Sequence, residues 1–102
     1  MSVYVHVTLE VRAACVARFV EAMGEIVPLL ESWGWKLTGA FMQRTGKLNT
    51  IIDLWEIDDH NHFDTVLKKF AAHPRFPALK AVLDDTINSE TIVFANTLDY
   101  RR

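Results

Sequence analysis

The chain has 102 residues, a formal net charge of −2 and 50% hydrophobic residues. This length predicts one domain over residues 1–102, and so high an apolar fraction indicates that another subunit covers part of the surface. The mixed charges exclude the basic stripe of a nucleic-acid-binding protein and the polybasic helix of a membrane-surface protein. A single cysteine rules out an internal disulfide and, with no signal-peptide pattern, predicts a cytoplasmic protein.

The first segment alternates between two kinds of residue, which predicts a strand with two different faces. One face carries Val3, Val5, Val7 and Leu9, and the other carries Tyr4, His6, Thr8 and Glu10. A helix follows, because apolar residues then recur at three- and four-residue spacings from Val16 to Leu30. Pro28 predicts a kink or a loosened last turn, and Gly34 is expected to end this helix.

Two further strands are predicted as a hairpin, over 35–44 and 48–57, joined by a short glycine-containing turn. Asp58 and Asp59 are candidate N-caps for the next helix, which the His73-Pro74 pair breaks in two. A final strand is predicted over 90–97. The order βαββαβ indicates an α+β, ferredoxin-like fold, with a four-stranded antiparallel sheet and the helices on one face. The first and third strands should be its central neighbours.

The third strand raises a question, because Asp53 lies at its centre between Ile52 and Leu54. We expect these two neighbours to face the helices and Asp53 to face the other way. The same alternation predicts a mixed open face of Tyr4, His6, Lys36, Thr38, Met42, Ile51, Asp53 and Trp55. This mixture favours a face covered by a second subunit, with polar groups left around a central cavity.

His6 and Asp53 are expected near the middle of adjacent antiparallel strands. Side chains that are cross-strand neighbours on one face lie about 5 Å apart at Cβ, so a His–Asp contact is predicted. Such a contact would raise the pKa of the imidazole and orient its ring. The alternative is a structural hydrogen bond that satisfies two half-buried polar groups.

Other polar clusters favour structural roles over metal binding. Asp58, Asp59, His60 and His62 lie at a helix start, where the two histidines diverge and capping is expected instead. His73 is expected to break the helix rather than to bind haem, and Cys15 is expected to be a packed thiol. The sequence therefore predicts no metal site, and it implies no cofactor.

Three stretches, Trp33 to Phe41, Gly46 to Asn49 and Asp53 to Ile57, resemble the NIPSNAP family. The resemblance implies a dimeric α+β barrel, a homodimer in which the open faces of two sheets pack together. It supplies no catalytic residues. Proteins with a similar fold, such as the antibiotic-biosynthesis-type monooxygenases, bind aromatic or haem substrates.

Two functions follow as hypotheses. The first is binding of a small, partly aromatic molecule in the barrel cavity, with or without cofactor-independent, monooxygenase-like chemistry. Its residues would be His6 as acid or base, Asp53 to orient it, and Tyr4, Lys36, Thr38, Met42 and Trp55 as ligand contacts. The second is a non-catalytic dimerisation or interaction module, which a filled interface would favour.

Overall fold

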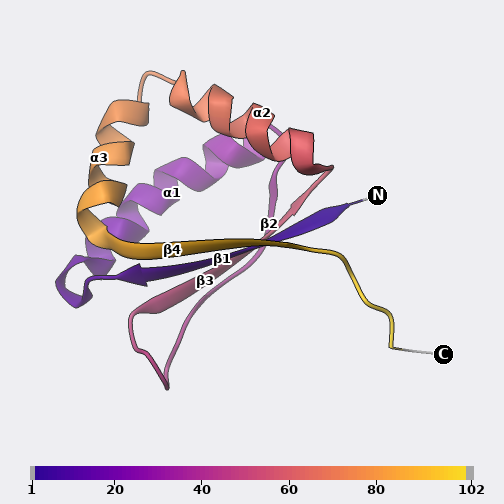
Figure 1. Cartoon of the computed structure of the whole chain (residues 1–102). Coiled ribbons are helices and arrows are strands. Elements are labelled where there is room, and N and C mark those ends of the chain that lie inside the picture. The colour runs from indigo at the N-terminus through magenta and orange to yellow at the C-terminus, as the bar shows by residue number, and fades with distance from the viewer. Residues whose placement is uncertain (1, 101–102) are drawn as a thin grey trace.

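A computed structural model describes residues 2–100 of the chain. Its elements are β1 (Val3–Val11), a 3-10 turn η1 (Ala13–Cys15), α1 (Val16–Ser32), β2 (Lys36–Met42), β3 (Thr50–Ile57), α2 (His60–Ala71), α3 (Phe76–Thr86) and β4 (Ile87–Ala95). They form an antiparallel sheet in the order β2-β3-β1-β4, with the helices on one side (Figure 1). The predicted ferredoxin-like fold is confirmed. None of the helices in the described residues is long and apolar enough to cross a membrane.

The register between β1 and β3 decides which side chains face the helices. Val5 pairs with Trp55 and Val7 pairs with Asp53. Paired residues of an antiparallel sheet project from the same face. Asp53 and Trp55 therefore lie with the buried valines on the helix side, and Leu54 lies on the open side. The prediction for β1 is confirmed, and the prediction that Asp53 faces away from the helices is wrong.

The difference in apolar side-chain size between the two alternating sets of β3 explains this error. The alternating set that contains Asp53 also contains three large side chains, each at most 7% exposed: Ile51, Trp55 and Ile57. Burial stabilises each of these by roughly 1.5–3 kcal/mol, and together they outweigh the cost of burying one carboxyl group. The other set offers only Ile52 and Leu54 in exchange. The strand therefore turns its larger apolar side chains, Ile51, Trp55 and Ile57, toward the helices. Asp53 belongs to the same alternating set and is buried with them.

A bulge in β2 changes the alternation of that strand. Opposite β3, the register moves from the pair Leu37 and Trp55 to the pair Gly39 and Leu54, which leaves Thr38 without a partner residue. The Thr38 hydroxyl donates a hydrogen bond to the backbone oxygen of Leu54 at 3.0 Å. The extra residue shifts every later side chain of β2 to the opposite face.

Beyond the bulge, Ala40 pairs with Asp53 and Met42 pairs with Ile51, both on the helix side. The sequence predicts Met42 on the open face together with Lys36. That part of the prediction is wrong, because it assumed an uninterrupted period of two along the strand. Only Lys36, which precedes the bulge, keeps the expected orientation.

The corner between α1 and β2 follows the predicted chemistry. Gly34 has a φ of 101°, and its N–H donates to the backbone oxygen of Glu31 at 3.0 Å. The N–H of Trp35 then donates to the backbone oxygen of Leu30 at 3.2 Å. Only glycine adopts this backbone geometry without strain, so the helix ends where expected. Pro28 lies inside α1, which continues beyond it.

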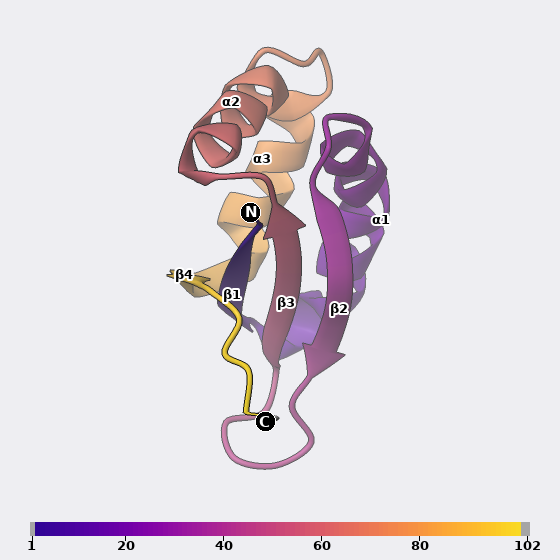
Figure 2. The ribbon, with the colours of Figure 1, turned by 90° about the vertical axis from the view of Figure 1, so that its right-hand side faces the viewer.

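His62 connects the start of α2 to the corner between α1 and β2. Asp59 caps the helix by accepting a hydrogen bond from the His62 N–H at 2.7 Å, as predicted. His62 Nδ1 accepts from the Asp58 N–H at 3.1 Å, which leaves Nε2 to donate to the Trp33 backbone oxygen at 2.9 Å. These contacts hold α2 over one end of the sheet (Figure 2).

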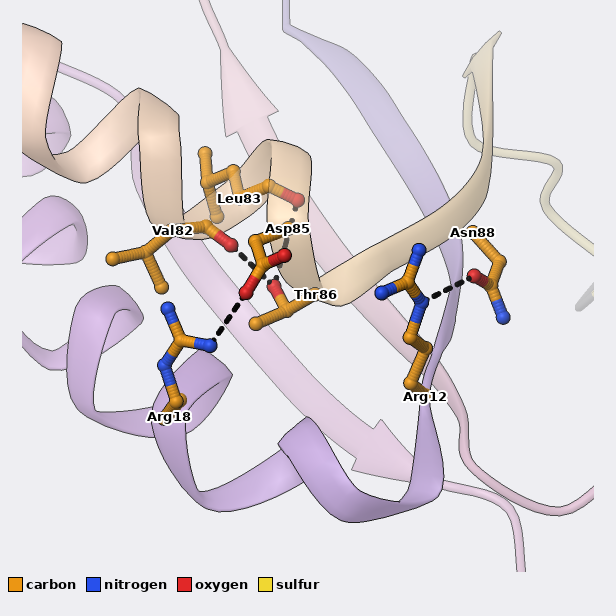
Figure 3. Close-up of polar contacts among 7 residues, drawn as sticks. All are labelled: Arg12, Arg18, Val82, Leu83, Asp85, Thr86 and Asn88. Carbon is orange, nitrogen blue, oxygen red and sulfur yellow. Dashed lines mark hydrogen bonds and ion pairs between the residues drawn. The ribbon is translucent and has the colours of Figure 1, made fainter.

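The opposite end of the helical layer is closed by polar contacts between distant segments (Figure 3). Arg18 of α1 pairs with Asp85 of α3 at 2.6 Å, and Arg12 donates to the Asn88 side chain at 3.1 Å. The backbone N–H of Arg12 also donates to the oxygen of Thr86, a fully buried residue, at 3.0 Å. The junction between α3 and β4 is thereby fixed against the start of α1.

Candidate functional site

A cavity of about 130 Å³ lies between the sheet and the helices. Its walls come from every layer of the fold and are almost entirely apolar, including Val7, Leu9, Phe19, Leu30, Phe63 and Phe70. An apolar cavity of about 150 Å³ in another protein binds benzene. The cavity therefore has the size and lining for one aromatic ring.

Asp53 is the feature of this cavity that ordinary core packing does not explain. The residue is 5% exposed and lines the cavity from the centre of β3. Within residues 2–100, its carboxyl group makes no hydrogen bond and no ion pair with any other group. Burial raises the pKa of Asp53 from 3.8 to about 6, because an apolar environment disfavours the charged form.

A second polar atom near the site also lacks a protein partner. Trp35 lines the cavity, and its indole Nε1 is buried without a hydrogen-bond acceptor in the described part of the chain. The Trp35 ring stacks on Phe63 at 5.2 Å and meets Trp55 edge-on at 5.4 Å. These contacts position the indole rigidly. The site thus combines a buried acceptor, a buried donor and an aromatic wall.

Glu90 of β4 is the other carboxylate that lines this cavity. It is exposed to solvent, whereas Asp53 is enclosed. The negative charge inside the cavity therefore rests on one group. A ligand that enters must meet the Asp53 carboxyl with a hydrogen-bond donor or with a positive charge, since an anion would be repelled.

The structure separates the predicted catalytic pair. His6 lies opposite Leu54 and Val93 on the open face and is exposed, whereas Asp53 lies opposite Val7 on the helix side. The two side chains project from opposite faces of the sheet. The prediction of a His6–Asp53 contact is therefore wrong. The physical reason is that β3 buries the alternating set with the larger apolar side chains, and this set contains Asp53.

The other predicted ligand contacts are likewise divided between the two faces. Trp55 shares the helix-side cavity with Asp53, although it is not on the barrel side as expected. Tyr4 and Lys36 remain on the open face, both paired with Glu56. Met42 lies on the helix side, and the Thr38 hydroxyl is engaged by the sheet backbone.

Sequence reasoning missed Trp35 and the cavity-lining residues of the helices. A usable signal was present, because Phe19 and Leu30 lie on the apolar stripe that predicted the first helix. Trp35 is predicted only as the first residue of the second strand. What the sequence did not provide was the tertiary arrangement that brings its indole beside Trp55 and Phe63.

The polar groups outside the cavity have structural contacts. His62 is bound on both ring nitrogens, and His73 accepts from the Arg75 N–H at 3.1 Å while packing edge-on against Trp33. Cys15 is half-buried against the core, which fits the expected packed thiol. Over residues 2–100, no group of three or more His, Cys, Asp or Glu side chains is placed to hold a metal ion.

Comparison with known proteins identifies the class to which this fold belongs. The sequence model of the NIPSNAP family, a family of unknown function, matches residues 4–95 of this chain. The match covers most of the sequence, so the chain belongs to the NIPSNAP family. No curated protein shows a significant sequence match.

Solved structures show the same architecture. An uncharacterized NIPSNAP domain protein from Burkholderia xenovorans superposes with a TM-score of 0.80 at 22% identity, covering 100% of this chain and 99% of that one. A NIPSNAP family protein from Agrobacterium tumefaciens gives a TM-score of 0.85 at 19% identity, with 98% and 89% covered. SnoaB from Streptomyces nogalater, a cofactor-independent oxygenase, gives 0.68 at 14% identity, with 96% and 94% covered. At these identities the similarity establishes the fold alone.

Proposed function

We propose that the chain binds a small molecule with one aromatic ring and a hydrogen-bond donor, such as a phenol, between its sheet and its helices. The observation that carries this proposal is the unpartnered Asp53 carboxyl in an otherwise apolar cavity of single-ring size. A buried polar group without a partner costs free energy, and a ligand hydroxyl that donates to it removes that cost. The proposed site thus differs from the barrel cavity that the sequence predicted.

Two probes of nearly equal shape test the role of Asp53. p-Cresol carries a hydroxyl group where p-xylene carries a methyl group, and calorimetry compares their affinities. A hydrogen bond to a charged acceptor corresponds to a preference of about 10- to 100-fold for p-cresol. Asp53→Leu should remove the preference, because leucine preserves the bulk and cannot accept a hydrogen bond.

His6→Ala is the matched control, since His6 lies on the other face of the sheet. It should leave both affinities unchanged. If neither probe binds, or if the preference survives in Asp53→Leu, the proposal fails. Loss of binding in His6→Ala would instead support the original barrel cavity.

The raised pKa of Asp53, about 6, favours a second function for the same cavity. A carboxylate with a pKa near the working pH is suited to act as a general base. It would take a proton from a carbon next to a carbonyl group: the C–H bond breaks, an O–H bond forms on Asp53, and an enolate remains. The cofactor-independent oxygenase SnoaB supports this only by showing that the fold accommodates an enzyme.

Proton abstraction has a direct assay that needs no further reactant. The exchange of deuterium into 2-indanone, followed by NMR in heavy water, measures the step alone. The rate should rise as the pH passes through about 6, where the carboxylate forms, and Asp53→Asn should abolish the acceleration. An exchange rate equal in the two proteins would rule out this function.

We also propose that the open face of the sheet forms a homodimer. This face carries exposed or half-buried apolar side chains from three of its four strands, including Phe41 of β2, Ile52 and Leu54 of β3, and Val93 of β4. Phe41 is 58% exposed and Val93 is 49% exposed within one chain. A two-fold symmetric partner would cover the same apolar surface on both chains, which accounts for the apolar composition.

Sedimentation velocity tests the dimer. Leu54→Arg places a charge at the centre of the open face and should convert a dimer into a monomer with an unchanged circular dichroism spectrum. Leu48→Arg is the control, because Leu48 is exposed on the hairpin loop. A wild-type protein that sediments as a monomer, or a dimer that survives Leu54→Arg, would contradict the proposal.

A further inference from the structure

A second apolar hollow lies beside the first, between α1 and the edge strand β2, with a volume of about 310 Å³. We call it the outer groove. Its walls include Val20 and Val27 from α1 and Leu37, Ala40 and Met42 from β2. In Figure 2, α1 lies behind β2 and β3, so the outer groove is on the helix side of the sheet.

The outer groove and the inner cavity share three wall residues: Phe19, Met23 and Asp53. Asp53 therefore borders both spaces, and Ala40 pairs with it directly across β2 and β3. Met23 is a flexible side chain that adapts to different occupants, so the wall between the spaces can adjust. The unpartnered carboxyl lies where the two spaces meet.

The walls of the outer groove expose large apolar side chains to solvent. Val20 is 58% exposed and Met42 is 51% exposed, although both belong to regular elements that flank the core. No charged group other than Asp53 lines the outer groove. Such a surface favours a hydrocarbon group over a polar one.

We infer that the inner cavity and the outer groove form one binding site for an alkyl-substituted phenol or a compound of the same chemistry. The ring occupies the inner cavity, the hydroxyl meets Asp53, and the alkyl chain extends past Met23 into the outer groove. This inference rests on the proposed binding function. It adds that the ligand has an apolar chain as well as a ring.

A series of 2-alkylphenols tests the inference, from o-cresol through 2-propylphenol to 2-hexylphenol. The ortho position places the chain on the same side of the ring as the hydroxyl, toward the junction that Asp53 borders. Burying one methylene group corresponds to about a fourfold gain in affinity, so calorimetry should show a steady increase along the series. Two variants place a negative charge in the wall of the outer groove, where it disfavours an alkyl chain. They are Met42→Glu on β2 and Val20→Glu on α1. Each should abolish the increase, because both residues line the outer groove and neither lines the inner cavity.

Leu48→Glu provides the same charge on the exposed hairpin loop, outside both spaces, and should keep the increase. Circular dichroism establishes that each variant is folded. If one of the two groove variants fails to fold, the other still provides the test. Binding of o-cresol without any increase with chain length would overturn this inference and leave the proposed function intact. Retention of the increase in both groove variants would also overturn it. No binding of either cresol would overturn both.

Discussion

The two faces of the sheet carry similar residue types but differ in what surrounds them. The helix side buries two tryptophans, several aliphatic residues and the Asp53 carboxyl, which has no partner among the described residues. The open side carries Tyr4, His6 and Phe41 beside Ile52 and Leu54, with much of this surface exposed in one chain. A polar residue at the centre of a strand therefore does not by itself identify the solvent-facing side of that strand.

The largest effect should separate two isoleucines of the same strand. Ile57 is 1% exposed on the helix side, whereas Ile52 is half-buried on the open side. Ile57→Ala should lower the free energy of unfolding by about 2–5 kcal/mol, since it leaves a cavity in the core. Ile52→Ala should cost less, and its cost should grow with protein concentration if a partner chain covers it. Urea denaturation at two concentrations measures both, and equal costs would contradict the assignment of faces.

The next effect comes from the pH dependence of stability. Because the pKa of Asp53 is raised in the folded state, from 3.8 to about 6, the folded protein holds the proton more tightly than the unfolded chain does. The contribution to stability is therefore present in full below about pH 4 and is lost as the pH rises through about 6. The difference corresponds to about 3 kcal/mol at 1.36 kcal/mol per pKa unit.

Asp53→Asn removes this titration with little change in shape. Relative to the wild type, the variant should gain stability between pH 4 and pH 7, by up to about 3 kcal/mol at neutral pH. Urea denaturation across this range measures the difference between the two proteins, so other titrating groups cancel. A difference that stays constant with pH would mean that Asp53 is not buried in an apolar environment.

The smallest effect concerns the helix that covers the cavity. Asp59→Ala removes the N-cap of α2 and should cost about 1 kcal/mol of stability. Asp58 is the matched control, because its backbone N–H contacts His62 while its carboxyl group is largely exposed. Asp58→Ala should therefore have almost no effect. Equal effects at the two positions, measured by thermal denaturation, would mean that the cap does not act as described.

The fold could be predicted from the sequence because its signals are local. The alternation from Val3 to Leu9, the apolar stripe of the first helix and the glycine after it each specify one element. The faces of β2 and β3 could not be predicted in the same way. A one-residue bulge at Thr38 inverts the end of β2, and the lone Gly39 beside it is only a weak local sign of a bulge.

The candidate site shows the same limit more sharply. The sequence marks Asp53 as an unusual residue and groups it with Trp55, but it does not identify the other residues of the cavity. Its environment depends on the competition between two alternating sets on β3, in which Ile51, Trp55 and Ile57 outweigh one carboxyl group. The sequence prediction placed Asp53 on the open face, because it considered the cost of burying one charge and not the summed burial of the larger side chains in the same set.

The central claim is that the Asp53 carboxyl lies in the apolar cavity under the helices. The most direct measurement is an NMR titration of its side-chain carboxyl carbon. We expect a midpoint at about pH 6, well above the usual value of 3.8 for aspartate. A midpoint near or below 3.8 would place the carboxyl in water or beside a positive charge, and would contradict the site and the functions proposed for it.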